Sequence, residues 1–174
     1  SGVEVYGLAW SPDSTRIAAG DTLGELIIWT LSTNHVATLT SSPRLAVNAV
    51  SWRPTGTHIA VTRRVVSVPG TWVEIYDSTT YQRVRTITLS EDGSADRVAW
   101  SPSGDRLAIT ANTLSVIVNY DTGQQVSLQE PGAYYSVTWS PDGTRIAAGG
   151  PNGVIRILDA VSAAVLQSYT MPSG

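Results

Sequence analysis

The residues best suited to recognise another molecule lie between positions 63 and 72. This stretch holds two cations, Arg63 and Arg64, a Pro69-Gly70 bend and the indole of Trp72. Arginine and tryptophan are enriched at the centres of protein interfaces, and extra chain length on a rigid scaffold is where binding groups tend to lie. The stretch therefore predicts a binding loop. The alternative is that its apolar side chains only lengthen a hairpin and pack on the edge of a sheet.

Positive charge is concentrated around the same stretch. Residues 44–85 hold six arginines against Glu74 and Asp77, a net charge of +4, although the whole chain carries −3. One interpretation is an anionic partner for this part of the chain, and the other is ordinary solvated arginine on a sheet surface. The acidic total argues against general nucleic-acid binding, so we expect no nucleic-acid partner.

No combination of residues predicts catalysis. The chain has two histidines, His35 and His58, without a second ligand at metal-binding spacing, and it has no cysteine. The glycine-rich string at 149–153 joins two expected strands, whereas a phosphate loop needs a helix N-terminus behind it. We therefore expect no catalytic residue, no metal site, no cofactor and no enzymatic activity.

The composition also bears on location. No apolar run approaches the ~20 residues of a membrane span, no signal peptide is recognisable at the start, and the lack of cysteine fits a reducing compartment. These features predict a cytoplasmic protein without a membrane partner. Eleven arginines without a single lysine are typical of a GC-rich bacterial genome.

A sequence repeat indicates which secondary-structure elements position these residues. The octapeptide WSPDGTRI begins at Trp139, and related copies begin at Trp10, Trp52 and Trp100, at spacings of 42, 48 and 39 residues. Self-similarity at a period of about 40 residues indicates a repeat architecture.

Each copy has the pattern of a β-hairpin followed by two more strands. Side chains before each tryptophan alternate with the period of a strand, and SPDG suits a type I turn. A second strand rich in alanine and β-branched residues, an apolar third strand and a more polar fourth strand follow. Four antiparallel strands repeated in this way predict an all-β fold of propeller blades, over residues 3–41, 44–90, 95–129 and 133–171.

These motifs resemble the WD-repeat β-propeller family, over almost the whole chain. The resemblance rests on the SPDG hairpin and on third strands that end in Tyr76-Asp77, Tyr120-Asp121 and Leu158-Asp159. The chain departs from the family in having no intact Trp-Asp pair, because Thr30 follows Trp29, and no Gly-His before the first strands. We therefore expect the family's buried His/Asp network to be missing. The hairpin is also similar to repeats of TolB-like and peptidase propellers, but the short third strand ending in an acidic residue favours the WD-repeat family.

The resemblance implies a common rim for the candidate binding residues. In WD-repeat propellers the turns between second and third strands share a face with the entries to the first strands. The implied partner-binding rim consists of Tyr6, Arg44, Asn48, Arg63, Arg64, Trp72, Asp96, Tyr134 and Tyr135. Four of these precede a hairpin tryptophan by four residues and would line the mouth of the central channel: Tyr6, Asn48, Asp96 and Tyr135.

Four blades raise the question of how the ring is closed. WD-repeat propellers commonly have seven or eight blades, and an open arc leaves two apolar end faces, which on soluble proteins mark association sites. The expected end faces hold Leu8, Ile17 and Ile27 in the first unit and Val137, Ile155 and Ile157 in the fourth. We expect a homodimer, joined head to tail, that completes an eight-bladed ring. A single-chain ring of four blades is the alternative, and it requires tighter wedges.

The predicted function is a non-catalytic scaffold that binds an unknown protein or peptide and also associates with itself. One alternative is a propeller that binds a small molecule or glycan, with Trp72, Tyr134 and Tyr135 as stacking platforms. Another is an excised or engineered repeat fragment of a larger sensor or scaffold protein, whose activity is self-association.

Overall fold

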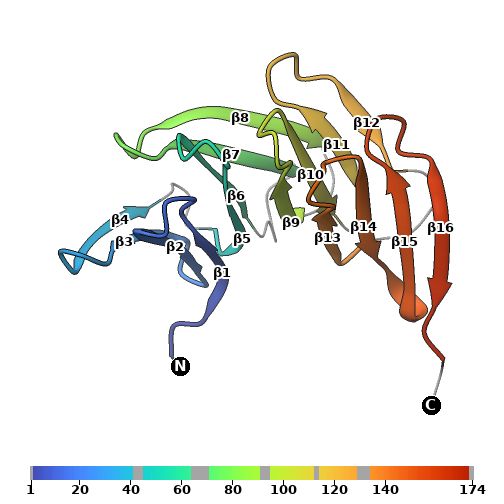
Figure 1. Cartoon of the computed structure of the whole chain (residues 1–174). Coiled ribbons are helices and arrows are strands. Elements are labelled where there is room, and N and C mark those ends of the chain that lie inside the picture. The colour runs from blue at the N-terminus through green and yellow to red at the C-terminus, as the bar shows by residue number, and fades with distance from the viewer. Residues whose placement is uncertain are drawn as a thin grey trace.

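The computed structural model describes residues 2–40, 45–63, 71–90, 95–111, 114–128 and 134–172. These residues form four antiparallel sheets of four strands each, which stand side by side in an open arc with the N-terminal and C-terminal sheets at its two ends (Figure 1). We call the sheets blades 1 to 4 in chain order. The predicted all-β fold with four strands per repeat is confirmed.

The strand bounds follow the repeats. Blade 1 contains β1 (Val5–Trp10), β2 (Arg16–Asp21), β3 (Glu25–Thr30) and β4 (His35–Thr40). Blade 2 contains β5 (Val47–Trp52), β6 (His58–Arg63), β7 (Thr71–Asp77) and β8 (Arg83–Ser90). Blade 3 contains β9 (Ala95–Trp100), β10 (Arg106–Ala111), β11 (Val116–Asn119) and β12 (Gln125–Ser127). Blade 4 contains β13 (Ser136–Trp139), β14 (Arg145–Gly149), β15 (Val154–Asp159) and β16 (Val165–Thr170), with a 3-10 turn η1 (Pro151–Gly153) before β15.

The turn between the first and second strands has a left-handed residue at its fourth place in every blade. Gly56, Gly104 and Gly143 have φ angles of 78°, 73° and 69° there, and Ser14 has a φ of 58° in blade 1. This conformation costs a residue with a side chain roughly 1–2 kcal/mol, which explains why three copies have glycine. The N–H of Ser14 still donates to the carbonyl of Ser11 at 2.9 Å, so the turn closes in the same way.

Each blade is a sheet with two faces. We call the face that holds the hairpin tryptophan the front face and the opposite one the back face, and strand pairing shows which side chains share the front face. In blade 1, Trp10 pairs with Ile17, and Ile17 pairs with Trp29, so the three side chains form one row across the sheet. The corresponding rows are Trp52-Ile59-Tyr76, Trp100-Leu107-Val118 and Trp139-Ile146-Leu158.

Apolar cores fill the spaces between adjacent blades. Leu26 and Ile28 from the back of blade 1 pack with Trp52 and Ile59 from the front of blade 2. The same arrangement recurs between blades 2 and 3 and between blades 3 and 4. The front of blade 1 and the back of blade 4 are therefore the two end faces of the described arc.

The first strand of each blade lies on the inner side of the arc (Figure 1). β1 contacts β5, β5 contacts β9 and β9 contacts β13. Gly20 of β2 also lies close to β5, because an added Cβ there would lie 2.0 Å from Cγ1 of Val47. Glycine at this position therefore lets blades 1 and 2 pack directly against each other.

Candidate interaction surfaces

An arginine stacked on a tryptophan recurs at each interface between blades. The guanidinium belongs to one blade and the ring is the hairpin tryptophan of the next blade. The pairs, with the distance from the guanidinium carbon to the ring centroid, are Arg16 and Trp52 at 4.9 Å, Arg53 and Trp100 at 5.1 Å, and Arg106 and Trp139 at 5.1 Å. A cation within about 6 Å of a ring centroid is attracted by the electrons of the ring face, so each contact helps to hold two blades together.

Arginines also donate hydrogen bonds to the backbone of the next blade. Nη1 of Arg16 donates to the carbonyl of Ser78 at 2.6 Å, and Nη1 of Arg106 donates to the carbonyl of Ala160 at 2.6 Å. Between blades 2 and 3, Arg85 donates to the equivalent carbonyl, after the third strand of blade 3. Each acceptor carbonyl belongs to the residue that comes directly after a third strand. The planar guanidinium suits this double role, because it can stack on a ring and donate in its own plane.

Sequence reasoning missed these stacked arginines, although a signal for them exists. An arginine stands directly before the apolar residue that pairs with the hairpin tryptophan in blades 1, 3 and 4, as Arg16, Arg106 and Arg145. In blade 2 that position holds His58, and Arg53 in the preceding turn supplies the guanidinium. Comparing the four copies position by position would have found the pattern.

The front of blade 1 is an exposed apolar face. Trp10 is 58% exposed, whereas the equivalent Trp52 and Trp100 are each 6% exposed. Leu8 and Trp29 are also exposed on this face. The predicted end-face residues Leu8, Ile17 and Ile27 lie on it together, because Leu8 and Ile27 both pair with Ala19 and Ile17 pairs with Trp10.

The back of blade 4 is the other end face. Ile155 and Ile157 lie on it, and Ile155 pairs with the exposed Tyr169. The assignment of Val137 to this face is wrong. Val137 pairs with Ala148 on the front of blade 4 and packs against the core between blades 3 and 4, because it lies an even number of residues from the front-face tryptophan.

Arg63 is buried rather than part of an exposed rim, so this part of the predicted rim is wrong. Its side chain is 1% exposed, its Nε lies 2.6 Å from Oε2 of Glu74, and its Nη1 donates to the carbonyl of Gly24 in blade 1 at 3.1 Å. A buried guanidinium needs such partners, and blades 1 and 2 supply them jointly. The rim candidates Arg44 and Arg64 lie outside the described residues.

Glu74 is the centre of this buried ionic cluster. Its Oε2 accepts from the hydroxyl of Tyr76 at 2.9 Å, and its Oε1 accepts from Nη1 of Arg83 at 2.7 Å. Burial by itself would raise the pKa of Glu74, but the charge of Arg63 and the hydrogen bonds from Arg63, Arg83 and Tyr76 together hold that pKa below its usual value. Burial raises the pKa of the Tyr76 hydroxyl. The carboxylate therefore stays ionised and ties the strands of blade 2 together.

Two of the three expected stacking platforms are not free rings. Trp72 lies within β7 and is partly buried. Tyr134 is 1% exposed, and its hydroxyl accepts from Nη1 of Arg156 at 3.3 Å. The expectation that Tyr134 lies exposed on a rim is therefore wrong, because its ring packs in the core between blades 3 and 4.

The four predicted channel-mouth residues lie at the starts of the inner strands. Tyr6 and Tyr135 are 49% and 57% exposed. Asn48 and Asp96 are partly buried, and Nδ2 of Asn48 donates to the carbonyl of Ala95 in the next blade at 3.1 Å. Aromatic side chains are thus available at the two ends of the arc, and polar side chains lie between them.

The SPDG turns hold aspartates with unusually low pKa values. Oδ1 of Asp142 accepts from the Ser140 hydroxyl at 2.6 Å, and from the N–H and hydroxyl of Thr144 at 3.0 and 2.8 Å. These hydrogen bonds lower the pKa of Asp142 to about 2, and equivalent bonds lower that of Asp13 to about 2. Each carboxylate thus accepts hydrogen bonds from its own turn and stabilises the bend between the first two strands.

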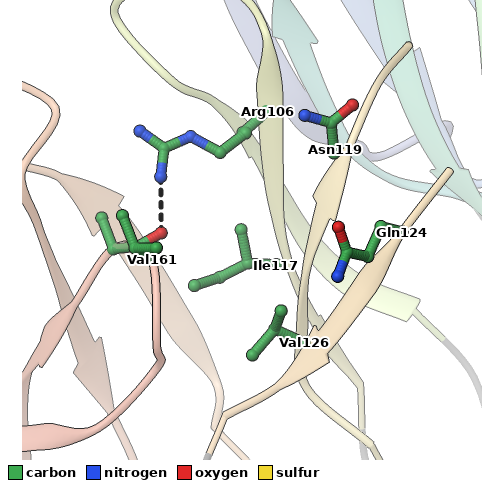
Figure 2. Close-up of a pocket in the computed structure, with 7 residues that line it drawn as sticks. Arg106, Ile117, Asn119, Gln124, Val126 and Val161 are labelled. Carbon is green, nitrogen blue, oxygen red and sulfur yellow. Dashed lines mark hydrogen bonds between the residues drawn. The ribbon is translucent and has the colours of Figure 1, made fainter. Parts of the chain in front are cut away.

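A pocket of about 200 Å³ lies between blades 3 and 4 (Figure 2). Ile117 and Val126 provide apolar walls, the amides of Asn119 and Gln124 lie on one side, and Arg106 reaches across to the loop of blade 4. Its lining residues within the described chain include no carboxylate, histidine or hydroxyl nucleophile. Ligand sites usually occupy about 300–1,000 Å³, so this pocket is smaller than a typical ligand site.

The described ranges contain neither a cluster of metal ligands nor a membrane-spanning helix. No group of three or more histidine, aspartate or glutamate side chains lies close enough there to hold a metal ion. None of the described helical segments is long and apolar enough to span a bilayer.

Two family models match the sequence. One is described as the anaphase-promoting complex subunit 4 WD40 domain and matches residues 98–174. The other is described as eukaryotic translation initiation factor eIF2A and matches residues 1–120. The two matches overlap in blade 3 and between them cover all four blades.

Solved structures share the fold. The β-propeller domain of Cps50 (Swd1) from Myceliophteria thermophila has a TM-score of 0.83 at 18% identity, over 100% of this chain and 57% of that chain. A chain of the mitotic checkpoint complex has a TM-score of 0.83 at 18% identity, over 97% of this chain and 51% of that chain. The present chain thus spans about half the length of the solved propellers that it matches.

Proposed function

Because this chain belongs to the WD-repeat β-propeller family, we propose that it is a non-catalytic scaffold for protein–protein interaction, and that two copies associate through their end faces into a closed ring of eight blades. The observation that carries this proposal is the exposure of Trp10. Trp10 is 58% exposed in blade 1, whereas the equivalent Trp52 and Trp100 of blades 2 and 3 are each 6% exposed, because a neighbouring blade covers them.

The end faces have the composition of an association surface. The front of blade 1 exposes Leu8, Trp10 and Trp29 on one sheet face, where interior blades expose none of the equivalent side chains to this extent. Contiguous apolar patches of this kind on a soluble protein mark sites of association. Tryptophan is also the residue type most enriched in interface hot spots, so covering this face supplies binding free energy.

A closed ring of two copies accounts for both end faces at once. Four blades are half of an eight-bladed ring, and the front of blade 1 in one copy then meets the back of blade 4 in the other. Each whole blade belongs to a single chain, because β1 is an innermost strand and β16 an outermost one. Closure therefore needs no exchange of strands.

Light scattering during size exclusion over a range of protein concentrations tests the association. The expected mass is twice 18.5 kDa, with dissociation on dilution. A mass of 18.5 kDa at every concentration up to the high micromolar range would overturn the dimeric ring.

The scaffold role is supported by the rim of the inner strands. Tyr6 and Tyr135 are exposed there, with Asn48 and Asp96 between them, and tyrosine is enriched where proteins contact each other. One of the matched solved structures is that of a multi-protein complex, the mitotic checkpoint complex. We propose that the rim of the present chain binds a protein or peptide partner.

Selection from a displayed peptide library on the purified protein tests the rim. We expect selected peptides to lose at least tenfold in affinity when Tyr6 or Tyr135 is changed to alanine. Val161→Ala is the control, because Val161 is 73% exposed at the turn before the outer strand of blade 4. Peptides that bind both tyrosine variants as well as the unaltered protein would place the binding surface elsewhere.

A further inference from the structure

We infer that ring closure uses a repetition of the interface already present between the blades, in which Arg145 of one copy stacks on Trp10 of a second copy. This inference rests on the proposed association and goes beyond it by naming the residues that meet and their register. Three features of the two end faces support it.

The back of blade 4 has the donor half of this interface. Arg145 begins β14, just as Arg16 begins β2 and Arg106 begins β10. The guanidinium groups of Arg16 and Arg106 each lie over the tryptophan of the next blade. Arg145 is exposed, and no aromatic ring of the described residues lies within stacking distance of it. Blade 4 thus has the cation without its ring.

The front of blade 1 has the acceptor half. Trp10 is the equivalent of Trp52, yet no guanidinium of the described residues covers it. Leu31 follows β3 directly, as Ser78 follows β7 and Ala160 follows β15. The N–H group of each of the three donates, at 3.0 Å, to the carbonyl of the residue that precedes the second strand of its own blade. The Leu31 carbonyl therefore has the same place as the two carbonyls that accept from arginine.

The sizes of a glycine on the second strand and a valine on the first strand also match across the two ends. Gly20 lies against Val47, which is five residues before Trp52. A Cβ added at Gly20 would lie 2.0 Å from Cγ1 of Val47. Gly149 has the same place in blade 4, and the nearest described atom to an added Cβ is Cβ of Ser136 at 3.8 Å. Val5 lies five residues before Trp10 and is 51% exposed.

This match indicates which molecule covers the end face. Within the chain, Gly20 lies against Val47 and Arg16 stacks on Trp52. Between two copies, Gly149 would meet Val5 and Arg145 would meet Trp10, which are the same residue types in the same positions. The two end faces of one chain thus hold both halves of the interface that joins its own blades. The occupant that we infer from this match is a second copy of this chain.

A double-mutant cycle on the dissociation constant of the dimer tests the contact, because two residues in contact give non-additive effects. We expect Arg145→Ala and Trp10→Ala each to weaken association at least tenfold, and the double variant to be scarcely weaker than either single variant. Arg97→Ala is the control for loss of one exposed arginine, and we expect it to leave association unchanged. Circular dichroism of each monomeric variant checks that folding is intact.

Cross-linking tests the register independently. Ala49 and Val98 pack in one core between blades 2 and 3, and the equivalent residues at the ring closure are Ser136 and Leu8. The chain has no cysteine, so Ser136→Cys and Leu8→Cys can be made as separate single-cysteine proteins. Under mild oxidation we expect disulfide-linked dimers in the mixture of the two and not in either protein alone.

The outcomes separate the two proposals. A protein that stays monomeric overturns the proposed dimeric ring, and this contact with it. A dimer whose Arg145 and Trp10 variants show fully additive effects, or which cross-links when Leu8→Cys is present alone, leaves the self-association standing and overturns the inferred contact.

Discussion

The guanidinium carbon of Arg16 lies 4.9 Å from the centroid of the Trp52 ring, while Nη1 of the same side chain donates to the carbonyl of Ser78 at 2.6 Å. One side chain of blade 1 therefore contacts both the hairpin and the third strand of blade 2. These two contacts together restrict how blade 2 can rotate against blade 1, because one side chain must satisfy both.

Replacing Arg16 with lysine removes the planar group while it keeps the charge. We expect Arg16→Lys to lower the free energy of unfolding by about 1 kcal/mol, because an ammonium cannot stack on Trp52 and donate to Ser78 with the same geometry. Urea denaturation measures the effect. Arg97→Lys is the matched control, since Arg97 is exposed and its side-chain hydrogen bonds within the described residues go to backbone carbonyls. Equal effects of the two variants would contradict a special role for Arg16.

The ionic cluster of Arg63 and Glu74 gives a second prediction. Removing one partner of a buried ion pair typically costs about 3–5 kcal/mol, so we expect Glu74→Gln to destabilise the protein by about that amount at pH 7. The side chains of the pair are only 1% and 3% exposed. Thermal unfolding of the variant at pH 7 measures the loss, and a change below about 1 kcal/mol would show that the pair contributes little.

The same carboxylate predicts a pH dependence with a definite sign. The pKa of Glu74 in the folded protein lies below 4.5, its ordinary value in an unfolded chain, so the unfolded chain takes up a proton first as the pH falls. The stabilisation from Glu74 is therefore complete above pH 4.5 and is lost as the pH falls below that value towards the folded pKa. We expect stability to fall less steeply in this window for Glu74→Gln than for the unaltered protein, in unfolding curves recorded at several pH values.

The close approach at Gly20 predicts an unequal response of two equivalent glycines. Gly20→Ala should destabilise by about 1–3 kcal/mol, because the new Cβ would lie 2.0 Å from Cγ1 of Val47. Gly149→Ala should be neutral or stabilise by about 0.4–1 kcal/mol, because the unfolded chain loses freedom and nothing is displaced. Urea denaturation at concentrations where the chain is monomeric compares them, and equal changes at the two sites would argue against the packing of Gly20 on Val47.

The first SPDG turn is strained at Ser14, and this strain can be relieved. Ser14 has a φ of 58°, where the other three copies have glycine, so we expect Ser14→Gly to stabilise the protein by about 0.5–1 kcal/mol. The reverse change at the equivalent position, Gly143→Ser, should destabilise by a similar amount. Melting temperatures of the two variants must move in opposite directions for this explanation to hold.

Much of the local structure was predictable from the sequence. The period-two alternation before each tryptophan placed the hairpins, because successive side chains of a strand point to opposite faces. The four copies of the turn motif placed the bends, because proline and glycine restrict the backbone locally. Strand pairing within a blade joins neighbours in the chain, so short-range patterns are enough to specify it.

The environment of individual side chains was decided only by tertiary structure. Arg63 looks like an exposed loop cation in sequence, yet it is buried because Gly24 in blade 1 and Glu74 in blade 2 satisfy its hydrogen bonds. Tyr134 is likewise buried between two blades. Their partners lie in other strands, and a local pattern does not show which strands will meet.

For the residues that link one blade to the next, the sequence likewise determined one part and the tertiary structure another. The sequence determined that Trp10 and Trp52 occupy equivalent positions, because each begins a copy of one motif. Only the packing of whole sheets decided that Trp52 is covered by Arg16 while Trp10 is exposed. The physical reason is that burial depends on what packs against a sheet face, and in a repeat fold the same residue is core or surface according to whether another blade lies against that face.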